Sequence, residues 1–242
     1  MSRVVSDLRG SRLQFVALAA TGALLCGGLP GCWSAARISE ARVEQSIAAG
    51  DPRVLVVPLN VSVALEPGLE AAVEPVQAEI LAHLNGEGAK VGFLAVEDAR
   101  SLWGQTVQTL RSLQRNTASL HIVAGTFVRS LKSEVDFDLL VMPSLGYREA
   151  QVARGYASWD GVRRSLTARH QQWTAKGRIP AFSLHVQVYL PDGRLWFQHW
   201  AGIDLVYQSD LESDSDVSAE RIQQIPDFIR VGVARALTRQ SN

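Results

Sequence analysis

Residues Arg53-Val54-Leu55-Val56-Val57-Pro58-Leu59-Asn60 decide the fold, because they form an almost unbroken apolar run. A strand with one face in water alternates apolar and polar residues, whereas a continuous run is typical of a central strand that is buried on both faces. Pro58 marks the expected end of this strand, since proline cannot donate a ladder hydrogen bond. The run therefore predicts a strand in the interior of a sheet.

Helices and strands alternate after this run. Apolar residues at helical spacing predict a helix over residues 67–85, which Pro75 either kinks or begins. The next expected elements are a strand over 91–96, helices over 97–113 and 119–131, and a strand over 137–143. The residues expected to face the core are Leu69, Val73, Val76, Ile80 and Leu84 in the first helix, Ala99, Leu102, Val107 and Leu110 in the second, and Ile122, Val123, Phe127 and Leu131 in the third. This order implies an α/β fold with a parallel or mixed sheet.

The second half of the chain changes to hairpin patterns. The pair Asp160-Gly161 predicts a tight turn between a segment over 147–159 and one over 162–169. A clearer hairpin joins residues 182–190 to 195–206 through Pro191-Asp192-Gly193-Arg194. A helix over 226–239 closes the chain, with Pro226 in its first turn and with Ile229, Val233 and Leu237 toward the core.

Pairing Leu190 with Leu195 fixes the expected register of the clearer hairpin. On its apolar face, Val188 lies opposite Phe197, Val186 opposite His199, Leu184 opposite Ala201, and Phe182 opposite Ile203. We expect this face to pack on helices. The other face carries Tyr189 opposite Trp196, Gln187 opposite Gln198, and His185 opposite Trp200.

The first 31 residues have the order of a secretory signal. Arg3, Arg9 and Arg12 precede the apolar segment Leu13–Leu25, which is shorter than the roughly 18–20 residues that span a bilayer. Leu29-Pro30-Gly31-Cys32 follows and resembles the cleavage site of bacterial lipoproteins. We therefore expect cleavage before Cys32 and acylation of its thiol. A transmembrane anchor and a cleaved signal without lipid are the alternatives.

Acylation at Cys32 implies firm membrane attachment, because several acyl chains anchor a protein where one chain binds only weakly. Cys26 is the weaker acceptor, since Leu25 is large for the position before a cut. An Asp directly after the acylated cysteine commonly retains lipoproteins in the inner membrane, and this chain has Trp33 at that position. The periplasmic face of the outer membrane is therefore the expected location. The chain has two cysteines, and both lie in this region, so no thiol is expected for catalysis, disulfides or metal binding.

Composition and charge narrow the possible functions. The 242 residues are 47% hydrophobic and 20% charged, which is typical of a globular protein with a proper core. The net charge is zero, and removal of residues 1–31 with their three Arg and one Asp leaves it near −2. A nucleic-acid partner is therefore disfavoured. The expected organisation is a signal peptide over 1–31, a lipidated tether over 32–51 and a single α/β domain over 52–242.

The runs over 54–60 and 137–143, and the turn over 190–196 before the closing helix, resemble a group of envelope α/β lipoproteins. The group includes the curli-secretion channel lipoprotein, the Pel exopolysaccharide-export lipoprotein and the lipoprotein activator of penicillin-binding proteins. The resemblance covers most of residues 53–239. It implies an α/β sandwich of the TolB N-terminal, anticodon-binding-like architecture and a role in envelope assembly or secretion.

The aromatic face of the clearer hairpin is the strongest candidate for a partner-binding surface. It carries Tyr189, Trp196, Trp200 and His185, and Trp159 and Trp173 would extend it. If this patch is exposed, it has the character of a protein contact surface. If a helix or the loop over 170–178 covers it, it belongs to the core.

A second candidate is a basic patch of Arg163, Arg164 and Arg169, with Lys176 and Arg178 nearby. Guanidinium groups match the geometry of carboxylates and phosphates, so the patch could meet lipid headgroups or an acidic polysaccharide. The alternative is a solvated strand edge whose charges discourage pairing with another sheet.

Motifs of well-defined chemistry are missing from the sequence. It has no Gly-x-Ser-x-Gly nucleophile elbow, P-loop or Gly-x-Gly-x-x-Gly segment. His185 and His199 are expected on opposite sheet faces and so cannot share a metal, and His199 suits a hydrogen-bonded core position. The acidic stretch over 210–216 lacks the spacing of a calcium-binding loop and suits a solvated loop. No catalytic residue, metal or cofactor is expected.

These patterns favour a non-enzymatic role. We expect a lipid-anchored envelope protein that acts as an assembly, secretion-accessory or regulatory component of a larger envelope complex, with itself as a possible partner in a homo-oligomer. The alternative is a periplasmic binding module for an acidic glycan or a small ligand. An enzyme is the third reading.

Overall fold

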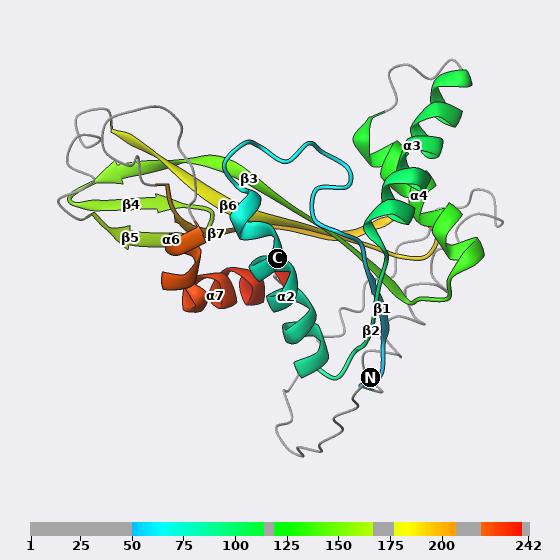
Figure 1. Cartoon of the computed structure of the whole chain (residues 1–242), viewed down its shortest axis with the longest axis horizontal. Coiled ribbons are helices and arrows are strands. Elements are labelled where there is room, and N and C mark those ends of the chain that lie inside the picture. The colour runs from blue at the N-terminus through cyan, green and yellow to red at the C-terminus, as the bar shows by residue number, and fades with distance from the viewer. Residues whose placement is uncertain (1–49, 114–118, 167–176, 207–218, 239–242) are drawn as a thin grey trace, which may run out of the picture.

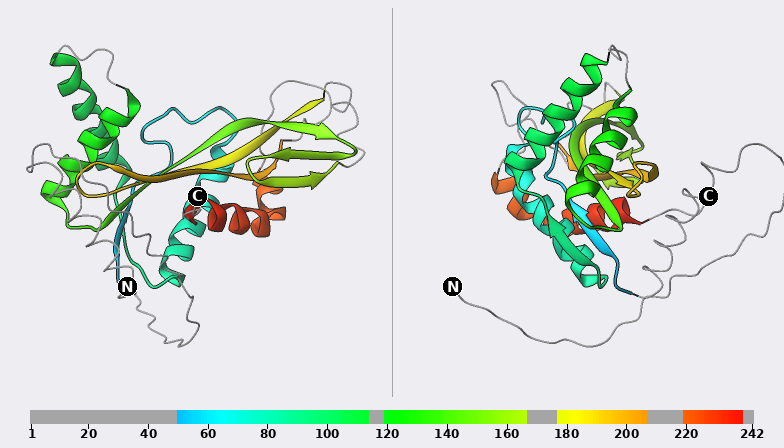
Figure 2. Two further views of the ribbon diagram at one scale, coloured as in Figure 1. Left: turned by 180° about the vertical axis from the view of Figure 1, so that it is seen from behind. Right: turned by 90° about the vertical axis from the view of Figure 1, so that its right-hand side faces the viewer.

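The computed structural model describes residues 50–113, 119–166, 177–206 and 219–238, which form a mixed seven-stranded sheet with helices on both faces (Figures 1 and 2). The strands are β1 Arg53–Val56, β2 Lys90–Phe93, β3 Leu139–Ala153, β4 Tyr156–Trp159, β5 Val162–Ser165, β6 Arg178–Tyr189 and β7 Leu195–Leu205. The helices are α2 Glu70–Gly86, α3 Val96–Ser112, α4 Leu120–Glu134, α6 Ala219–Gln224 and α7 Pro226–Leu237. The α/β class is confirmed. The leader and Cys32 lie outside these residues.

Strand β1 is the interior strand that the apolar run predicts. It lies between β2 and β3 and is parallel to both, with Val54 paired to Val91 on one side and to Leu139 on the other. Parallel neighbours need long crossover connections, which α2 and the α3–α4 pair supply. Val54 and Val56 enter the core on one face of the sheet, and Leu55 enters the core on the opposite face.

Strand β3 is a single 15-residue strand. The sequence predicts a strand that ends at Pro143 and a separate one from Tyr147, and this prediction is wrong. In a strand, the N–H and C=O of one residue point to the same side. The carbonyl of Pro143 accepts a hydrogen bond from Asn60 N at 3.1 Å, so its nitrogen faces the loop after β1 and not β6. Pro143 therefore costs no ladder hydrogen bond with β6.

Two tight turns follow β3. Arg154 and Gly155 have φ angles of 51° and 78°, and Asp160 and Gly161 have φ angles of 35° and 75°. Two successive positive φ angles are typical of a type I′ hairpin turn. The Asp160-Gly161 turn is confirmed, but it joins β4 to β5, so the expected hairpin is instead the three-stranded meander β3–β4–β5.

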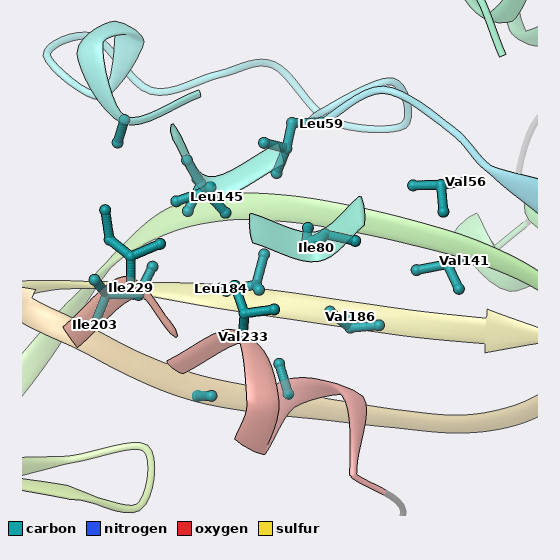
Figure 3. Close-up of a cluster of buried hydrophobic side chains, with 14 of the residues drawn as sticks. Val56, Leu59, Ile80, Val141, Leu145, Leu184, Val186, Ile203, Ile229 and Val233 are labelled. Carbon is teal, nitrogen blue, oxygen red and sulfur yellow. The ribbon is translucent and has the colours of Figure 1, made fainter. Parts of the chain in front are cut away.

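Helices α2 and α7 cover one face of the sheet (Figure 3). Their buried residues, among them Ile80, Ile229 and Val233, pack on the side chains of Leu184 and Val186. This confirms the apolar face expected for the β6–β7 hairpin. Helix α2 begins at Glu70, and Pro75 lies inside it.

Among the described residues, the opposite face is covered near its two ends. At one end, α4 packs on the sheet with Phe127, Val128 and Leu131. Ile122 is expected to face inward but is 45% exposed. The inward side of α4 carries Gly125, and a Cβ there would lie 2.7 Å from the Gly193 carbonyl of the β6–β7 turn. Close backbone packing therefore sets the rotation of this helix.

At the other end, the β4–β5 hairpin curls over the sheet and reaches β7. Trp159 and Val162 form a third apolar cluster with Ile179 and Leu205. A Cβ on Gly202 would lie 2.6 Å from Trp159 Nε1, so only glycine leaves room for this indole. The Gly202 N–H also donates to the Asp160 carbonyl at 3.1 Å.

The register of the β6–β7 hairpin is confirmed between Ser183 and Val188 and is wrong at both ends. At the turn, Tyr189 pairs with Leu195, and at the far end Phe182 pairs with Asp204. Each shift marks a β-bulge or irregularity, which turns the neighbouring side chains to the other face. Trp196 therefore packs with the α2–α7 cluster, whereas Tyr189 packs beneath α4.

Candidate functional site

The middle of the sheet face opposite α2 and α7, between α4 and the β4–β5 hairpin, is lined by polar and aromatic side chains. Five of them are at least partly exposed, and we call them the central strip: Ser144, Arg148, His185, Gln198 and Trp200. Their neighbours along each strand, such as Leu145, Leu184 and Val186, point into the α2–α7 core. The strip therefore occupies the stretch of this face between the two apolar clusters.

A stack of three side chains forms the centre of the strip. The rings of His185 and Trp200 are parallel within 9°, with their centroids 4.3 Å apart. The Arg148 guanidinium lies 4.7 Å from the Trp200 ring centroid, which is a cation–π contact. The indole reaches across β6 to Gly146, where a Cβ would touch it at 3.8 Å. Since Gly146 lies between Ser144, which pairs with His185, and Arg148, the indole lies between the imidazole and the guanidinium.

The turn residue Asp160 holds Arg148 in this stack. Its carboxylate accepts hydrogen bonds from Arg148 Nε at 3.0 Å and from Ser183 Oγ at 2.7 Å. Its side chain is 12% exposed, so the ion pair is partly shielded from water. The left-handed backbone of Asp160, which Asp tolerates better than most residues, is what aims the carboxylate back at β3.

His185 is uncharged at neutral pH. Burial lowers the pKa of His185 to about 4, and a hydrogen bond with Gln198 opposes this shift only in part. The charge of Arg148 also lowers this pKa. A group with such a pKa is a poor general base or acid near pH 7, where catalysis needs a pKa close to the working pH.

The strip offers polar groups together with the stacked rings of His185 and Trp200. The Trp200 ring already contacts the His185 ring and the Arg148 guanidinium, which leaves less of its surface for a sugar ring to stack on. Arg148 is neutralised by Asp160, and His185 is neutral. Such a surface can make hydrogen bonds and van der Waals contacts, as the polar parts of protein interfaces do. Within the part of the chain that the structure describes, no three His, Cys, Asp or Glu residues are grouped so that they could hold a metal ion.

The four predicted partner-binding residues do not form one surface. His185 and Trp200 lie together as expected. Tyr189 is 1% exposed beneath α4, and Trp196 belongs to the opposite face. Trp159 is buried in the third cluster, and Trp173 lies outside the described residues. The sequence reasoning left open whether a helix or the loop over 170–178 covers this patch. Helix α4 covers its Tyr189 end, and most of the loop lies outside the described residues.

The predicted basic patch is also divided. Arg163 lies over the Tyr156 ring at 4.0 Å from its centroid, and Arg164 lies over the Phe228 ring at 3.9 Å. Arg164 also donates to the Ile203 carbonyl at 3.2 Å, and burial lowers its pKa. Arg178 pairs with Glu149 at 2.9 Å. Arg169 and Lys176 lie outside the described residues, as does the acidic stretch over 210–216.

Sequence reasoning did not assign Ser144, Arg148 or Gln198 to the site, nor Asp160, which holds Arg148 in place. It placed Asp160 in a turn without a role for its carboxylate. The signal that could have found Arg148 and Asp160 is the repeat of Gly155 and Gly161 around a four-residue segment, which marks a meander that brings Asp160 back beside β3.

No protein-family model, curated protein or solved structure matches this chain. None of the helices in the described ranges combines the length and the hydropathy of a membrane span. The proposals below therefore depend on the residues of this chain alone.

Proposed function

We propose that this chain is a lipid-anchored envelope protein, held on the periplasmic face of the outer membrane through acyl chains on Cys32. The observation that carries the proposal is the order of the leader: three arginines, a short apolar segment and Leu29-Pro30-Gly31-Cys32. The first strand begins at Arg53. About twenty residues thus separate the acylated cysteine from the folded body, which at roughly 3.3 Å per extended residue lets the body stand well away from the bilayer.

We further propose that the body acts without catalysis, as an assembly or regulatory component of a larger envelope complex. The central strip is the surface that this role would use. Its neutral, hydrogen-bonding character and its position between two covered ends of the sheet support contact with another folded protein, including a second copy of the chain. The low pKa of His185 and the contacts of Trp200 with His185 and Arg148 favour such contact over acid–base chemistry or sugar stacking.

The finer architecture is also a proposal. A parallel β1–β2 pair, a long antiparallel β3–β6–β7 unit and a closing helix on one face are consistent with a variant of the TolB N-terminal sandwich. The role as an acidic-glycan module has less support, because Arg164 is engaged by the Ile203 carbonyl and Arg178 forms a surface ion pair with Glu149.

Labelling with a palmitate analogue tests the anchor. We expect the wild-type chain and a Cys26→Ala variant to incorporate the label and to sediment with membranes. A Cys32→Ala variant should lose both properties. Equal labelling of Cys32→Ala and wild type, or a chain that keeps residues 1–31 in cells, would contradict the proposal.

The mass of the acylated chain in detergent tests the contact surface. Gln198→Arg places a bulky charge on the exposed strip, and Gln108→Arg makes the same change at an exposed position on α3. We expect wild type and Gln108→Arg to form oligomers and Gln198→Arg to shift toward one chain, with circular dichroism unchanged. Identical oligomers in all three would exclude the strip as the contact surface for self-assembly.

A further inference from the structure

A pocket of about 490 Å³ lies between the loop that follows β1 and the helices α2 and α3. One wall is the loop over 59–65 that follows β1. The other walls are Val73 of α2 and Arg100 and Trp103 of α3. Its volume falls within the range of small-molecule sites, roughly 300–1,000 Å³.

The walls of this pocket are fixed by contacts outside it. The loop is tied down at Asn60, whose side-chain amide donates to the Leu145 carbonyl and accepts from the Leu145 N–H, both at 2.9 Å. Leu65 packs against the α2–α7 core. Trp103 is held by an edge-on contact with Phe127, with their ring centroids 5.3 Å apart. Asn60, Leu65 and the Trp103 ring are therefore held in place before a ligand binds, which lowers the entropic cost of binding.

The lining presents polar and apolar surface in about equal amounts, and Arg100 is its one cationic side chain. Val61, Val63, Leu65 and Val73 supply aliphatic surface, and Trp103 supplies an aromatic ring. Arg100 is exposed, and within the described ranges no hydrogen bond or ion pair engages its guanidinium. The Asn60 amide is already used by Leu145, so Ser62 and Arg100 are the polar side chains left to face a ligand.

We propose that this pocket binds a small ligand with an apolar body and one anionic group, a carboxylate or a phosphate. The apolar body lies against Trp103 and the valines, and the anion pairs with the Arg100 guanidinium, whose fork of N–H donors matches either group. The inference does not rest on the proposed anchoring or on the central strip, because it uses none of their residues.

Calorimetric titration with three naphthalene probes tests the charge requirement. The probes are 1-naphthoate, 1-naphthyl phosphate and the cation 1-naphthylmethylammonium, each added to the full chain in detergent after subtraction of a micelle blank. We expect one-to-one binding of at least one anion and much weaker binding of the cation. The stronger anion then shows whether the site prefers a carboxylate or a phosphate. Absence of saturable binding by both anions, or equal binding of the cation, would overturn the proposal.

Three variants locate the binding. Arg100→Ala should weaken the better anion roughly tenfold or more, because it removes a charge-assisted hydrogen bond. Arg111→Ala removes another exposed arginine of α3, outside the pocket, and should leave affinity unchanged. Ala64→Trp, on the exposed loop, should fill the pocket and abolish binding without unfolding the chain. Unchanged affinity in Arg100→Ala or in Ala64→Trp would show that the anion binds elsewhere and would refute the assignment.

Discussion

The buried hydroxyl of Tyr189 lowers the stability of the fold, although its aromatic ring belongs to the core. Its ring is 1% exposed beneath α4, and within the described ranges its hydroxyl has no hydrogen-bond partner. Burial raises the pKa of Tyr189 to about 12. An unpaired hydroxyl in an apolar setting costs about 1–3 kcal/mol, so at this position the aromatic ring stabilises the fold while its oxygen opposes it.

Tyr189→Phe should therefore leave the free energy of unfolding unchanged or raise it by about 1 kcal/mol. Tyr147→Phe is the matched control, because the Tyr147 hydroxyl donates to the Pro67 carbonyl at 3.0 Å and its loss should lower stability by about 1 kcal/mol. Urea denaturation measures both. A clear loss of stability in Tyr189→Phe would mean that its hydroxyl has a partner, such as a bound water.

His185 should make the protein sensitive to acid. Folding lowers the pKa of His185 from 6.5 to about 4, chiefly through burial. Between these pH values the unfolded chain binds a proton that the folded chain does not, so stability falls as pH falls. The charges of nearby Arg148 and His121 also lower the pKa of His185, and the charge of Asp160 raises it.

His185→Phe keeps an aromatic ring on Trp200 and cannot titrate. Between pH 6.5 and 4 the wild type should lose about 1–2 kcal/mol more than this variant, a figure reduced for the partial exposure of the ring. Urea unfolding at several pH values measures the difference. Parallel stability curves for the two proteins would show that His185 is not responsible.

At the scale of the element, the edge of β3 is protected by side chains where no strand covers it. Beyond β1, the side chain of Asn60 binds both backbone groups of Leu145, and the Glu66 carboxylate accepts from Tyr147 N at 2.9 Å. The Asn60 side chain thus makes the two hydrogen bonds that a neighbouring strand would otherwise make with Leu145. Open strand edges invite pairing with other chains, so this loop also limits aggregation.

Asn60→Gly should lower the free energy of unfolding by about 1–3 kcal/mol through the loss of both hydrogen bonds. Glycine suits the φ angle of 59° at this position, so backbone strain does not enter the result. Asn60→Asp keeps the acceptor and loses the donor, so its free energy of unfolding should lie between those of wild type and Asn60→Gly. Thermal unfolding gives the order, and an Asn60→Gly chain as stable as wild type would show that the loop does not depend on these bonds.

Sequence patterns correctly predicted the elements whose structure depends on residues close to them in the sequence. The apolar run of β1, the stripe of α2 and the central register of β6–β7 depend on periodicity and turn chemistry, and all three were confirmed. The continuation of β3 through Pro143 was not predictable in this way, because it depends on which side of the strand meets Asn60. The register shift that turns Trp196 to the other face likewise leaves no periodic signal in the sequence.

The candidate site was predictable only in part for the same reason. His185 and Trp200 are directly opposite in a hairpin, so their contact follows from register alone. Arg148 and Asp160 join them through two turns and the curl of β4–β5, which no single pattern contains. The lipidation of Cys32 stays a prediction, since it lies outside the described residues.

At the scale of the whole molecule, the first and last helices of the described chain hold the sheet together. Helix α7 packs on α2 and on β6 and β7, and its Ile229, Val233 and Ala236 are buried. Burial of Ile229 and Val233 alone contributes about 3–6 kcal/mol, a large share of the roughly 5–15 kcal/mol that stabilises a domain.

A chain that ends at Ile225 should therefore lose cooperative unfolding near room temperature. A chain that ends at Thr238 keeps all of α7 and is the control, expected to match wild type. Thermal circular dichroism and limited proteolysis compare them. A sharp transition in the shorter chain would mean that the sheet is stable without its last helix.

Helix α7 follows all seven strands of the sheet in the sequence, so the apolar surface that it covers stays exposed in a nascent chain until this helix has been synthesised. Exposed apolar surface makes such a chain a target for chaperones and prone to aggregation. The described fold can therefore be completed only after α7 has left the ribosome.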